Sequence, residues 1–364
     1  MRRWLRIALV SVLLTVLGAA CWFLLLDGRA PGQRPDLVRL PDGVPRAPRG
    51  YPTPNAVYLS YLLGHLKLVD YQGEITVPDG VTEKLGVEYG RAGEKPLLLD
   101  LYRPAAPHEP TPGLVFIHGG GWKKGNRSDY KYYAVRFADR GYVVATVSYR
   151  LSGEATFPAA VEDVKCAIRW MRAHAEELGV DPDRIAAIGG SAGGHLAMMA
   201  GYTANVPDLE GNGGHGGVSS AVQAIVNLYG PCDLTVSDGR DEPVVTAFLG
   251  TTYAESPRDF ERASPLFHLD RSDPPTLIIH GTVDQLVPVE QSDALAERLG
   301  GLGIPYWYDR LDGWPHTLDA AEATNARTFL LISKFLDAFL GGSATGRESA
   351  EERQVPGSEM VTGL

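Results

Sequence analysis

The sequence contains little cysteine. Its three cysteines, Cys21, Cys166 and Cys232, show neither CxxC spacing nor a cysteine and histidine cluster. No structural zinc site and no disulfide framework are therefore predicted. Cys166 lies in an amphipathic helical pattern over residues 161–171, which favours a small buried side chain. Pairing of Cys166 with Cys232 remains open if the chain folds in an oxidising compartment.

An excess of positive charge is also missing. The chain has 34 Lys and Arg against 44 Asp and Glu, which gives a formal net charge of -10, and no basic face or finger motif is visible. Nucleic acid is therefore not an expected partner, because binding to it depends on neutralising phosphates. A hydrophobic content of 44% and a charged content of 21% are ordinary values for a globular protein. Global disorder is excluded on the same grounds.

One long apolar run stands at the amino terminus. Three arginines within the first six residues precede an uncharged stretch at residues 7–26, about the length that a helix needs to cross a bilayer. This order predicts a cytoplasmic amino terminus and an exported remainder. A signal anchor is favoured over a cleaved signal peptide, because the run continues beyond the small residues 18–20. Lipidation of Cys21 is a third alternative. The expected location is the cell membrane with an extracytoplasmic catalytic domain, or secretion if the segment is cleaved.

Composition divides the chain into four parts. Residues 1–26 form the anchor or signal peptide, and residues 27–54 are dense in Pro, Gly and Arg, which predicts an extended tether that holds the rest off the membrane. Residues 55–340 are expected to form the catalytic domain. Residues 341–364 are rich in Gly, Ser and Glu, and a disordered tail is predicted there.

Strand-like and helix-like patterns alternate within the domain. Short apolar runs ending in turn residues cover 97–102, 114–118, 142–148, 184–189, 224–229, 276–280 and 306–309. Helical patterns cover 130–139, 159–178, 193–202, 289–299 and 320–340. This alternation predicts an α/β fold, with a mostly parallel central sheet and helices on both faces. Functional sites in such a sheet lie at the carboxyl ends of the strands.

The strongest local motif is Gly-x-Ser-x-Gly around Ser191, directly after one strand-like run and directly before a helical one. A nucleophilic serine on such a turn adopts a strained backbone, and the small residues Gly189, Gly193 and Gly194 let the turn close against its neighbours. The amino end of the following helix favours negative charge near the serine. Ser191 is the predicted nucleophile.

A second motif, His-Gly-Gly-Gly-Trp at residues 118–122, follows the strand-like run 114–118. Consecutive glycines let backbone NH groups converge on an oxyanion. We assign this role to the NH groups of Gly120, Gly121 and Ala192. His118 is expected to shape the loop, and Trp122 either lines the substrate pocket or covers the glycines.

The order of the remaining candidates predicts the rest of a Ser-His-Asp set. Asp284 stands on a loop after the run 276–280, and His316 is the only histidine that follows both Ser191 and Asp284. A serine hydroxyl needs a base near neutral pH, and that base needs a carboxylate to orient it. His280 is expected to end a buried strand. No metal or other cofactor is required by this chemistry.

The segments HGGGW at 118–122, GGSAGGHLA at 189–197 and HGTVD at 280–284, with the late His316, resemble the α/β-hydrolase superfamily. More narrowly, they are similar to acetyl- and carboxylesterases of the hormone-sensitive-lipase-like and bifunctional feruloyl/acetylxylan-esterase groups. The resemblance covers about residues 85–340 and implies the α/β-hydrolase fold, with a possible small lid. The long region 229–275 is either a substrate-facing insertion or a surface excursion.

These patterns predict a serine carboxylesterase that acts on short-chain, acetyl-like esters of a small molecule or a polysaccharide. An exported peptidase or amidase with the same residues is the alternative, because the motifs do not separate ester from amide hydrolysis. A catalytically silent, anchored binding module would need a broken site, and none is visible. The sequence leaves the oligomeric state open.

Overall fold

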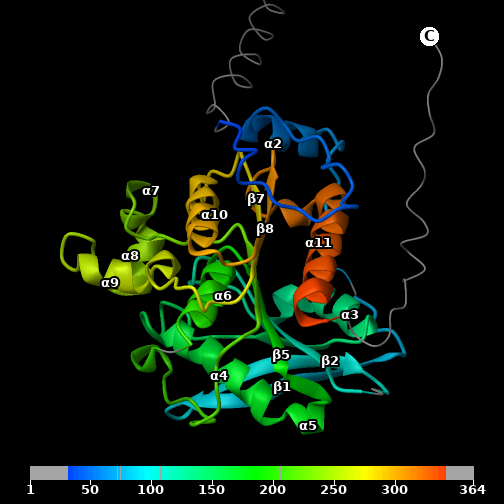
Figure 1. The fold of residues 1–364 in the computed structure, drawn as a ribbon, viewed down its shortest axis with the longest axis vertical. Coiled ribbons are helices and arrows are strands. Elements are labelled where there is room, and N and C mark those ends of the chain that lie inside the picture. The colour runs from blue at the N-terminus through cyan, green and yellow to red at the C-terminus, as the bar shows by residue number, and fades with distance from the viewer. Residues whose placement is uncertain (1–31, 72, 74, 107–108, 205, 342–364) are drawn as a thin grey trace, which may run out of the picture.

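An eight-stranded sheet forms the centre of the computed structural model, which describes residues 32–341 except 72, 74, 107–108 and 205 (Figure 1). The strands are β1 (Val81–Ala92), β2 (Lys95–Pro104), β3 (Thr111–Ile117), β4 (Val143–Val147), β5 (Val180–Gly190), β6 (Ala224–Leu228), β7 (Thr276–Gly281) and β8 (Tyr306–Leu311). Their order is β1-β2-β4-β3-β5-β6-β7-β8. Only β1–β2 and β2–β4 pair antiparallel, so the mostly parallel sheet predicted from the sequence is confirmed.

Helices cover both faces of this sheet. One hydrophobic cluster joins the sheet to α4 (Ala159–Ala173), α6 (Ala192–Tyr202) and α10 (Glu290–Leu302). A second cluster on the other face joins it to α3 (Lys131–Asp139) and α11 (Glu322–Leu340). The strands β3 and β6 are buried along their whole length, as expected for parallel strands covered on both sides. The remaining α-helices of the described part are α2 (Pro54–Leu62), α5 (Ala175–Leu178), α7 (Ser237–Arg240), α8 (Pro243–Leu249) and α9 (Pro257–Arg262).

Strand β1 was not predicted. It is an edge strand that pairs only with β2, and most of its residues are exposed or half-buried, with Val81 and Tyr89 as the buried exceptions. Such a strand needs few apolar residues, so its sequence carries glutamate, lysine, arginine and two glycines rather than an apolar alternation. It is specified by its partner strand more than by its own pattern.

The two described cysteines are separate. Cys166 and Cys232 are both buried and free. Cys166 lies on α4 near the carbonyl of Tyr89, whereas the Sγ of Cys232 lies 3.0 Å from the carbonyl oxygen of Gln291. The buried position predicted for Cys166 is confirmed, and the disulfide that the sequence left open is not formed.

The described part of the predicted tether lies against the domain instead of standing off it. Arg39 exchanges two backbone hydrogen bonds with Tyr308 of the edge strand β8, at 3.3 and 2.8 Å. Further along, the carbonyl of Pro48 accepts a hydrogen bond of 3.1 Å from the indole of Trp314. The Pro-rich composition does keep the segment extended, but β8 offers unpaired backbone groups that an extended chain can use. The segment therefore packs on the domain at Arg39 and Pro48, contacts that the extended tether predicted for residues 27–54 did not include.

The predicted anchor at residues 1–26, and all of the predicted tail at residues 341–364 except Gly341, lie outside the described residues. Between residues 32 and 341, leaving aside the gaps named above, no helix is both long and apolar enough to span a membrane.

Candidate functional site

Ser191 lies on a strained turn between β5 and α6. Its backbone has φ 56° and ψ -125°, a conformation that non-glycine residues rarely adopt. The turn forms because β5 ends at Gly190 and α6 begins at Ala192, so one residue must reverse the chain. The strained backbone predicted for Ser191 is confirmed.

Three glycines allow this turn to pack tightly. A Cβ atom on Gly193 would lie 2.0 Å from the carbonyl oxygen of Ile117, and one on Gly194 would lie 2.4 Å from Asn227 Oδ1. A Cβ on Gly189 would lie 2.3 Å from the carbonyl of Gly193. No side chain fits at these positions, which explains why the turn is so rich in glycine.

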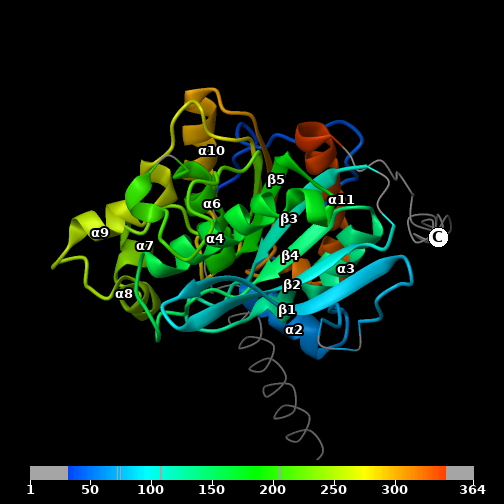
Figure 2. The same ribbon diagram turned by 90° about the horizontal axis from the view of Figure 1, so that it is seen from below.

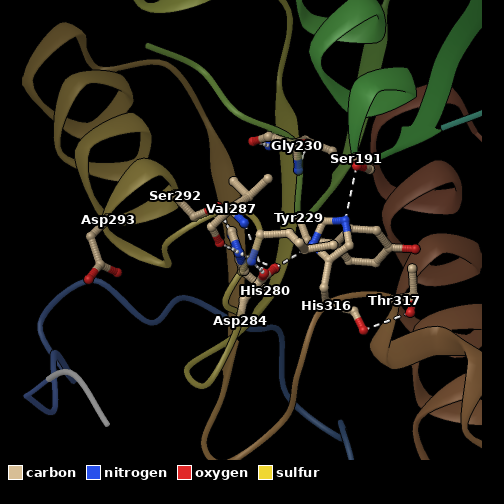
Figure 3. Close-up of polar contacts among 12 residues, drawn as sticks. Ser191, Tyr229, Gly230, His280, Asp284, Val287, Ser292, Asp293, His316 and Thr317 are labelled. Atoms are coloured by element: carbon tan, nitrogen blue, oxygen red, sulfur yellow. Dashed lines mark hydrogen bonds and ion pairs between the residues drawn. The ribbon is translucent and has the colours of Figure 1, made fainter. Parts of the chain in front are cut away.

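His316 and Asp284 meet Ser191 at the carboxyl ends of the strands. Figure 3 shows the imidazole of His316 between the other two side chains. Its Nε2 lies 2.9 Å from Ser191 Oγ, and its Nδ1 lies 2.6 Å from Asp284 Oδ2. Since the carboxylate only accepts hydrogen bonds, Nδ1 carries the proton and Nε2 is free to accept from the serine hydroxyl. The three predicted residues are therefore brought together in the order that proton transfer from the serine requires.

Asp284 receives hydrogen bonds on both of its oxygens. The backbone NH groups of Leu286 and Val287 donate to Oδ1 at 2.8 and 2.9 Å, and both His316 and His280 donate to Oδ2. Burial alone would raise the pKa of Asp284, but the hydrogen bonds from the two histidines outweigh burial and hold that pKa well below its ordinary value. The carboxylate thus stays ionised and fixed in orientation.

His280 is a functional neighbour that the sequence reasoning treated only as the end of a buried strand. Its Nε2 lies 3.0 Å from Asp284 Oδ2 and 2.9 Å from the carbonyl oxygen of Val287, two groups that can only accept. Its Nδ1 lies 2.7 Å from Ser292 Oγ on α10. Nε2 therefore carries a proton and donates to these two acceptors, while Nδ1 is hydrogen-bonded to Ser292. The spacing His280-x-x-x-Asp284 was the only signal in the sequence for this contact.

The glycine loop lies beside the nucleophile. Gly120 has φ 99° and Gly121 has φ 61°, values that side chains disfavour. A Cβ on Gly119 would lie 3.3 Å from the Cβ of Ser191, so the loop passes directly over the turn. The NH of Ala192 belongs to the first residue of α6 and has no partner within the helix. All three predicted oxyanion residues, Gly120, Gly121 and Ala192, line the same cavity as Ser191.

His118 turns back onto its own loop. Its Nδ1 lies 2.8 Å from the carbonyl oxygen of Gly119, and its ring stacks on Tyr149 at 4.3 Å. Burial lowers the pKa of His118 from its ordinary value. The predicted role of His118 in shaping the loop agrees with these contacts.

Trp122 joins the glycine loop to the region between β6 and β7. Its ring stacks on Phe248 of α8 at 4.5 Å, and its Nε1 donates to His195 Nδ1 at 3.2 Å. The side chain is buried and also lines the cavity, so both interpretations of Trp122 apply. His195 in turn donates from Nε2 to the carbonyl of Ala263 at 2.7 Å.

Of the region 229–275, residues between 229 and 245 line the cavity, and residues 246–275 do not. Figure 2 shows α7, α8 and α9 gathered at one side of the domain. Val244 and Val245 of α8 line the cavity, and a Cβ on Gly121 would lie 2.7 Å from Val244 Cγ2. Helix α8 therefore closes over the glycine loop.

Loss of folding stability in acid is expected to depend partly on His195. Burial lowers the pKa of His195 to about 4, against the hydrogen bond to Ala263, which raises it. The unfolded chain binds a proton at this residue below about pH 6.5, whereas the folded chain does not, so stability falls as pH falls through this window. Replacing His195 with glutamine should reduce the difference in unfolding free energy between pH 7 and pH 5 by about 2 kcal/mol. Urea titrations of both proteins measure this difference, and the exposed His65→Gln variant is the control. Equal differences in His195→Gln and wild type would contradict the prediction.

Opposite the glycine loop, the cavity has a polar wall. Tyr229 packs its ring edge-on against His316 at 4.7 Å, and its hydroxyl donates to Asp319 Oδ1 at 2.5 Å. Tyr133 donates to Asp319 Oδ2 at 3.2 Å. Burial raises the pKa of Asp319, against the hydrogen bonds from the two tyrosines. Tyr133, Tyr229 and Asp319 were not predicted as site residues, because they come from three separate segments of the chain.

The cavity encloses about 1080 Å³. The glycine loop and Val244 bound it on one side, and Tyr229 and Asp319 bound it on the other, with Ser191 between them. Ser191 therefore faces the cavity, with space on both sides of its hydroxyl for the two parts of a ligand. No cluster of three or more metal-ligating side chains occurs in the part of the chain that the structure describes.

Comparisons with known proteins place this chain in a family. The model of the BD-FAE family matches residues 99–299, a range that contains Ser191 and Asp284 and ends before His316. Esterase LipC of Mycobacterium tuberculosis is 36% identical over 237 residues, which cover 59% of this chain and 58% of LipC. Esterase LipQ of the same organism is 33% identical over 262 residues, which cover 70% of this chain and 61% of LipQ. The matched part of the chain thus spans 58 to 61% of the length of these two relatives.

Solved structures show the same relationship. The butyrate-bound esterase Est2 of Thermogutta terrifontis has a TM-score of 0.63 and 30% identity, with 74% of this chain and 97% of Est2 covered. A bifunctional GH43-CE protein of Bacteroides eggerthii has a TM-score of 0.63 and 29% identity, with 69% of this chain and 38% of that chain covered. The chain has the α/β-hydrolase fold and belongs to the BD-FAE family.

Proposed function

We propose that this protein is a serine carboxylesterase that hydrolyses short-chain, acetyl-like esters through Ser191, His316 and Asp284. The observation that carries the proposal is the continuous chain of hydrogen bonds from Ser191 Oγ to His316 and on to Asp284, at 2.9 and 2.6 Å. The names of the relatives LipC and LipQ support an ester substrate.

In the proposed reaction, Ser191 Oγ attacks the ester carbonyl carbon while His316 Nε2 takes the hydroxyl proton. The carbonyl oxygen becomes an anion that accepts hydrogen bonds from the NH groups of Gly120, Gly121 and Ala192. When the tetrahedral intermediate collapses, the C–O bond to the alcohol breaks and His316 returns the proton to the leaving alcohol. Water then repeats these steps on the acyl-enzyme and releases the acid and free Ser191.

Short acyl groups are favoured because α8 crowds the glycine loop. The approach of Val244 to Gly121 leaves little room on that side of the nucleophile. The Est2 structures, which were solved with propionate and with butyrate bound, support a small acyl group.

Shortening Val244 is expected to shift the preferred acyl length. In the Val244→Ala variant, kcat/KM for a p-nitrophenyl hexanoate should rise relative to the acetate by about 10-fold, the scale of one or two methylenes in a pocket. The matched control is Val236→Ala, because Val236 is exposed and does not line the cavity. An unchanged ratio in Val244→Ala would place the acyl group on the other side of Ser191.

Ester hydrolysis and amide hydrolysis are distinguished by comparing turnover of an ester with turnover of the matching amide. We expect p-nitrophenyl acetate to be turned over far faster than the matching anilide. Faster anilide or peptide cleavage would favour the peptidase or amidase alternative. Covalent reaction with a fluorophosphonate probe addresses the third alternative, since a silent binding module would not react.

The natural ester is inferred from two structural neighbours, and the location of the enzyme is inferred from the start of the sequence. The GH43-CE neighbour and a neighbour described as a carbohydrate esterase from gut microbiota favour an ester linked to a polysaccharide. The arginines and the apolar run at the start of the sequence favour export, with the domain on the outer side of the membrane. Protease accessibility of the domain in intact cells tests the location.

A further inference from the structure

Helix α2 exposes its apolar side chains. Tyr58, Leu59, Tyr61 and Leu62 are between 37% and 60% exposed, and Leu63 directly after the helix is 62% exposed. With 3.6 residues per turn, Tyr58, Leu59, Leu62 and Leu63 fall on one continuous face of the helix. Together with Tyr61 and Leu68, these four residues make up six of the eleven large hydrophobic residues that are exposed in the described part of the chain. We call these six residues the α2 patch.

The side of α2 that faces the domain is less apolar than the side that faces outward. Ser60 is half-buried and donates to the hydroxyl of Tyr51 at 3.0 Å, and Thr53 caps the start of the helix. A helix that only covered a core would place its leucines inward and its serine outward. The reversed arrangement marks the outer face of α2 as a contact surface.

The α2 patch adjoins the cavity of Ser191. Leu68 pairs with Ala321, and the NH of Val69 donates to the carbonyl of Ala320, which lines the cavity. Tyr71, three residues beyond Leu68, also lines the cavity. The Leu68 end of the α2 patch is therefore joined directly to the lining of the cavity.

The chemistry of the patch fits the interface of a lipid bilayer. Tyrosine and leucine together suit the boundary between headgroups and acyl chains, where the phenol hydroxyl stays hydrated. Helix α2 carries no charged residue, whereas exposed basic residues flank it in sequence at Arg46, Arg49 and Lys67. Asp42 and Asp70 are the acidic residues in the same stretches, so the basic residues outnumber them.

The position of the patch in the chain points the same way. The apolar run at residues 7–26 precedes α2, and residues 27–53 connect the two in the sequence. Figure 1 shows the first described residues, in dark blue, at the same end of the molecule as α2. A bilayer is the partner that accounts for both apolar segments.

We propose that the α2 patch is an interfacial docking surface that rests in the headgroup region of a lipid bilayer and brings the mouth of the Ser191 cavity to the membrane. This surface is distinct from the predicted anchor, and its docking does not depend on the esterase activity proposed above. The consequence for function, which does rest on that activity, is that esters held in the membrane reach Ser191 from the side of α2.

Spin labels on the full-length protein test the docking directly. A nitroxide is attached to cysteine in Leu62→Cys and, as the control, in Leu85→Cys, both with Cys21→Ser, and the proteins are mixed with phosphatidylglycerol-containing vesicles. Leu85 is a matched control because it is 59% exposed, like Leu62 at 60%, and lies on β1. At position 62, vesicles should raise the relaxation caused by oxygen and lower the relaxation caused by a polar nickel complex, each by about 3-fold or more, as expected for a label at the interface.

Each other outcome overturns the proposal. Equal exposure to the nickel complex at positions 62 and 85 with vesicles present would show that α2 stays in water. Protection at position 62 without vesicles would assign the patch to the chain's own first residues, or to a second copy if the label spectra broaden with protein concentration.

A charge variant links docking to activity. Leu62→Glu with Leu63→Glu should lower turnover of an ester dispersed in vesicles by about 10-fold, because charge at the interface is disfavoured. Turnover of soluble p-nitrophenyl acetate should not change, which also shows that the variant is folded. Leu85→Glu should change neither rate. An equal loss on both substrates would mean a structural role for α2, and no turnover of any ester by the wild type would fail the proposed function while leaving the spin-label result valid.

Discussion

Replacing Ser191 with alanine is expected to lower kcat for p-nitrophenyl acetate by about 10⁵-fold or more, the scale seen when the nucleophile of a serine hydrolase is removed. The reason is that the acyl group then has no oxygen to which it can transfer. His316 and the glycine loop would remain, so a small residual rate above that in water is expected. Initial rates measured with the Ser191→Ala variant and the wild type at equal protein concentration give this ratio.

The control for this variant is Ser333→Ala. Ser333 is a buried serine on α11, where it is hydrogen-bonded to Arg140 and Phe329, away from the cavity. Its loss should leave kcat within about 2-fold of wild type, since it touches no reacting group, even if stability falls by about 1 kcal/mol. A Ser191→Ala protein that keeps wild-type turnover would remove Ser191 from the mechanism.

Replacing Asp284 with asparagine is expected to lower kcat by about 10⁴-fold, the scale of a wrong histidine tautomer in such a site. The loss of kcat follows from the hydrogen bonds that Asp284 accepts. Its Oδ1 accepts from two backbone NH groups, so the single oxygen of asparagine must stay at that position. The new NH₂ group then faces His316 Nδ1, which must give up its proton to accept. That tautomer places the proton on Nε2, the atom that must be unprotonated to accept the proton of Ser191.

His280 adds a second unfavourable contact in the Asp284→Asn variant. The same NH₂ group would face His280 Nε2, which already donates to the carbonyl of Val287. Measurement of kcat and KM separately distinguishes this effect from a binding defect, because KM should change little. Asp312→Asn is the control, since Asp312 lies close to His316 in sequence but is exposed. If Asp284→Asn loses less than about 10-fold, a different acid orients His316.

The turn at Ser191 and the glycine loop could be predicted because their requirements are local. Each is a buried strand followed at once by glycines, and Gly193 must lack a side chain to fit against Ile117. Asp284 and His316 needed only their order along the chain and their places after strands. A parallel sheet gathers the carboxyl ends of its strands, so the sequence order was sufficient to bring them together.

The contacts of His280, Tyr229 and Asp319 could not be predicted in the same way. Asp319 accepts from a tyrosine 90 residues away in the sequence, and no periodic pattern records such a pairing. Likewise, the stacking of Trp122 on Phe248 depends on how the region 229–275 folds back over the sheet. Tertiary packing decides these contacts, and the pairing of Arg39 with Tyr308 at the β8 edge depends on it in the same way.

The central claim is that Ser191 is an activated nucleophile. Its most direct test is reaction of the full-length protein with a fluorophosphonate, followed by digestion and mass spectrometry of the peptides. We predict one adduct, on Ser191, and its loss in the His316→Ala variant, in which no base takes the serine proton. An adduct on another residue, or ester hydrolysis that continues after full exposure to the probe without any adduct, would contradict the account.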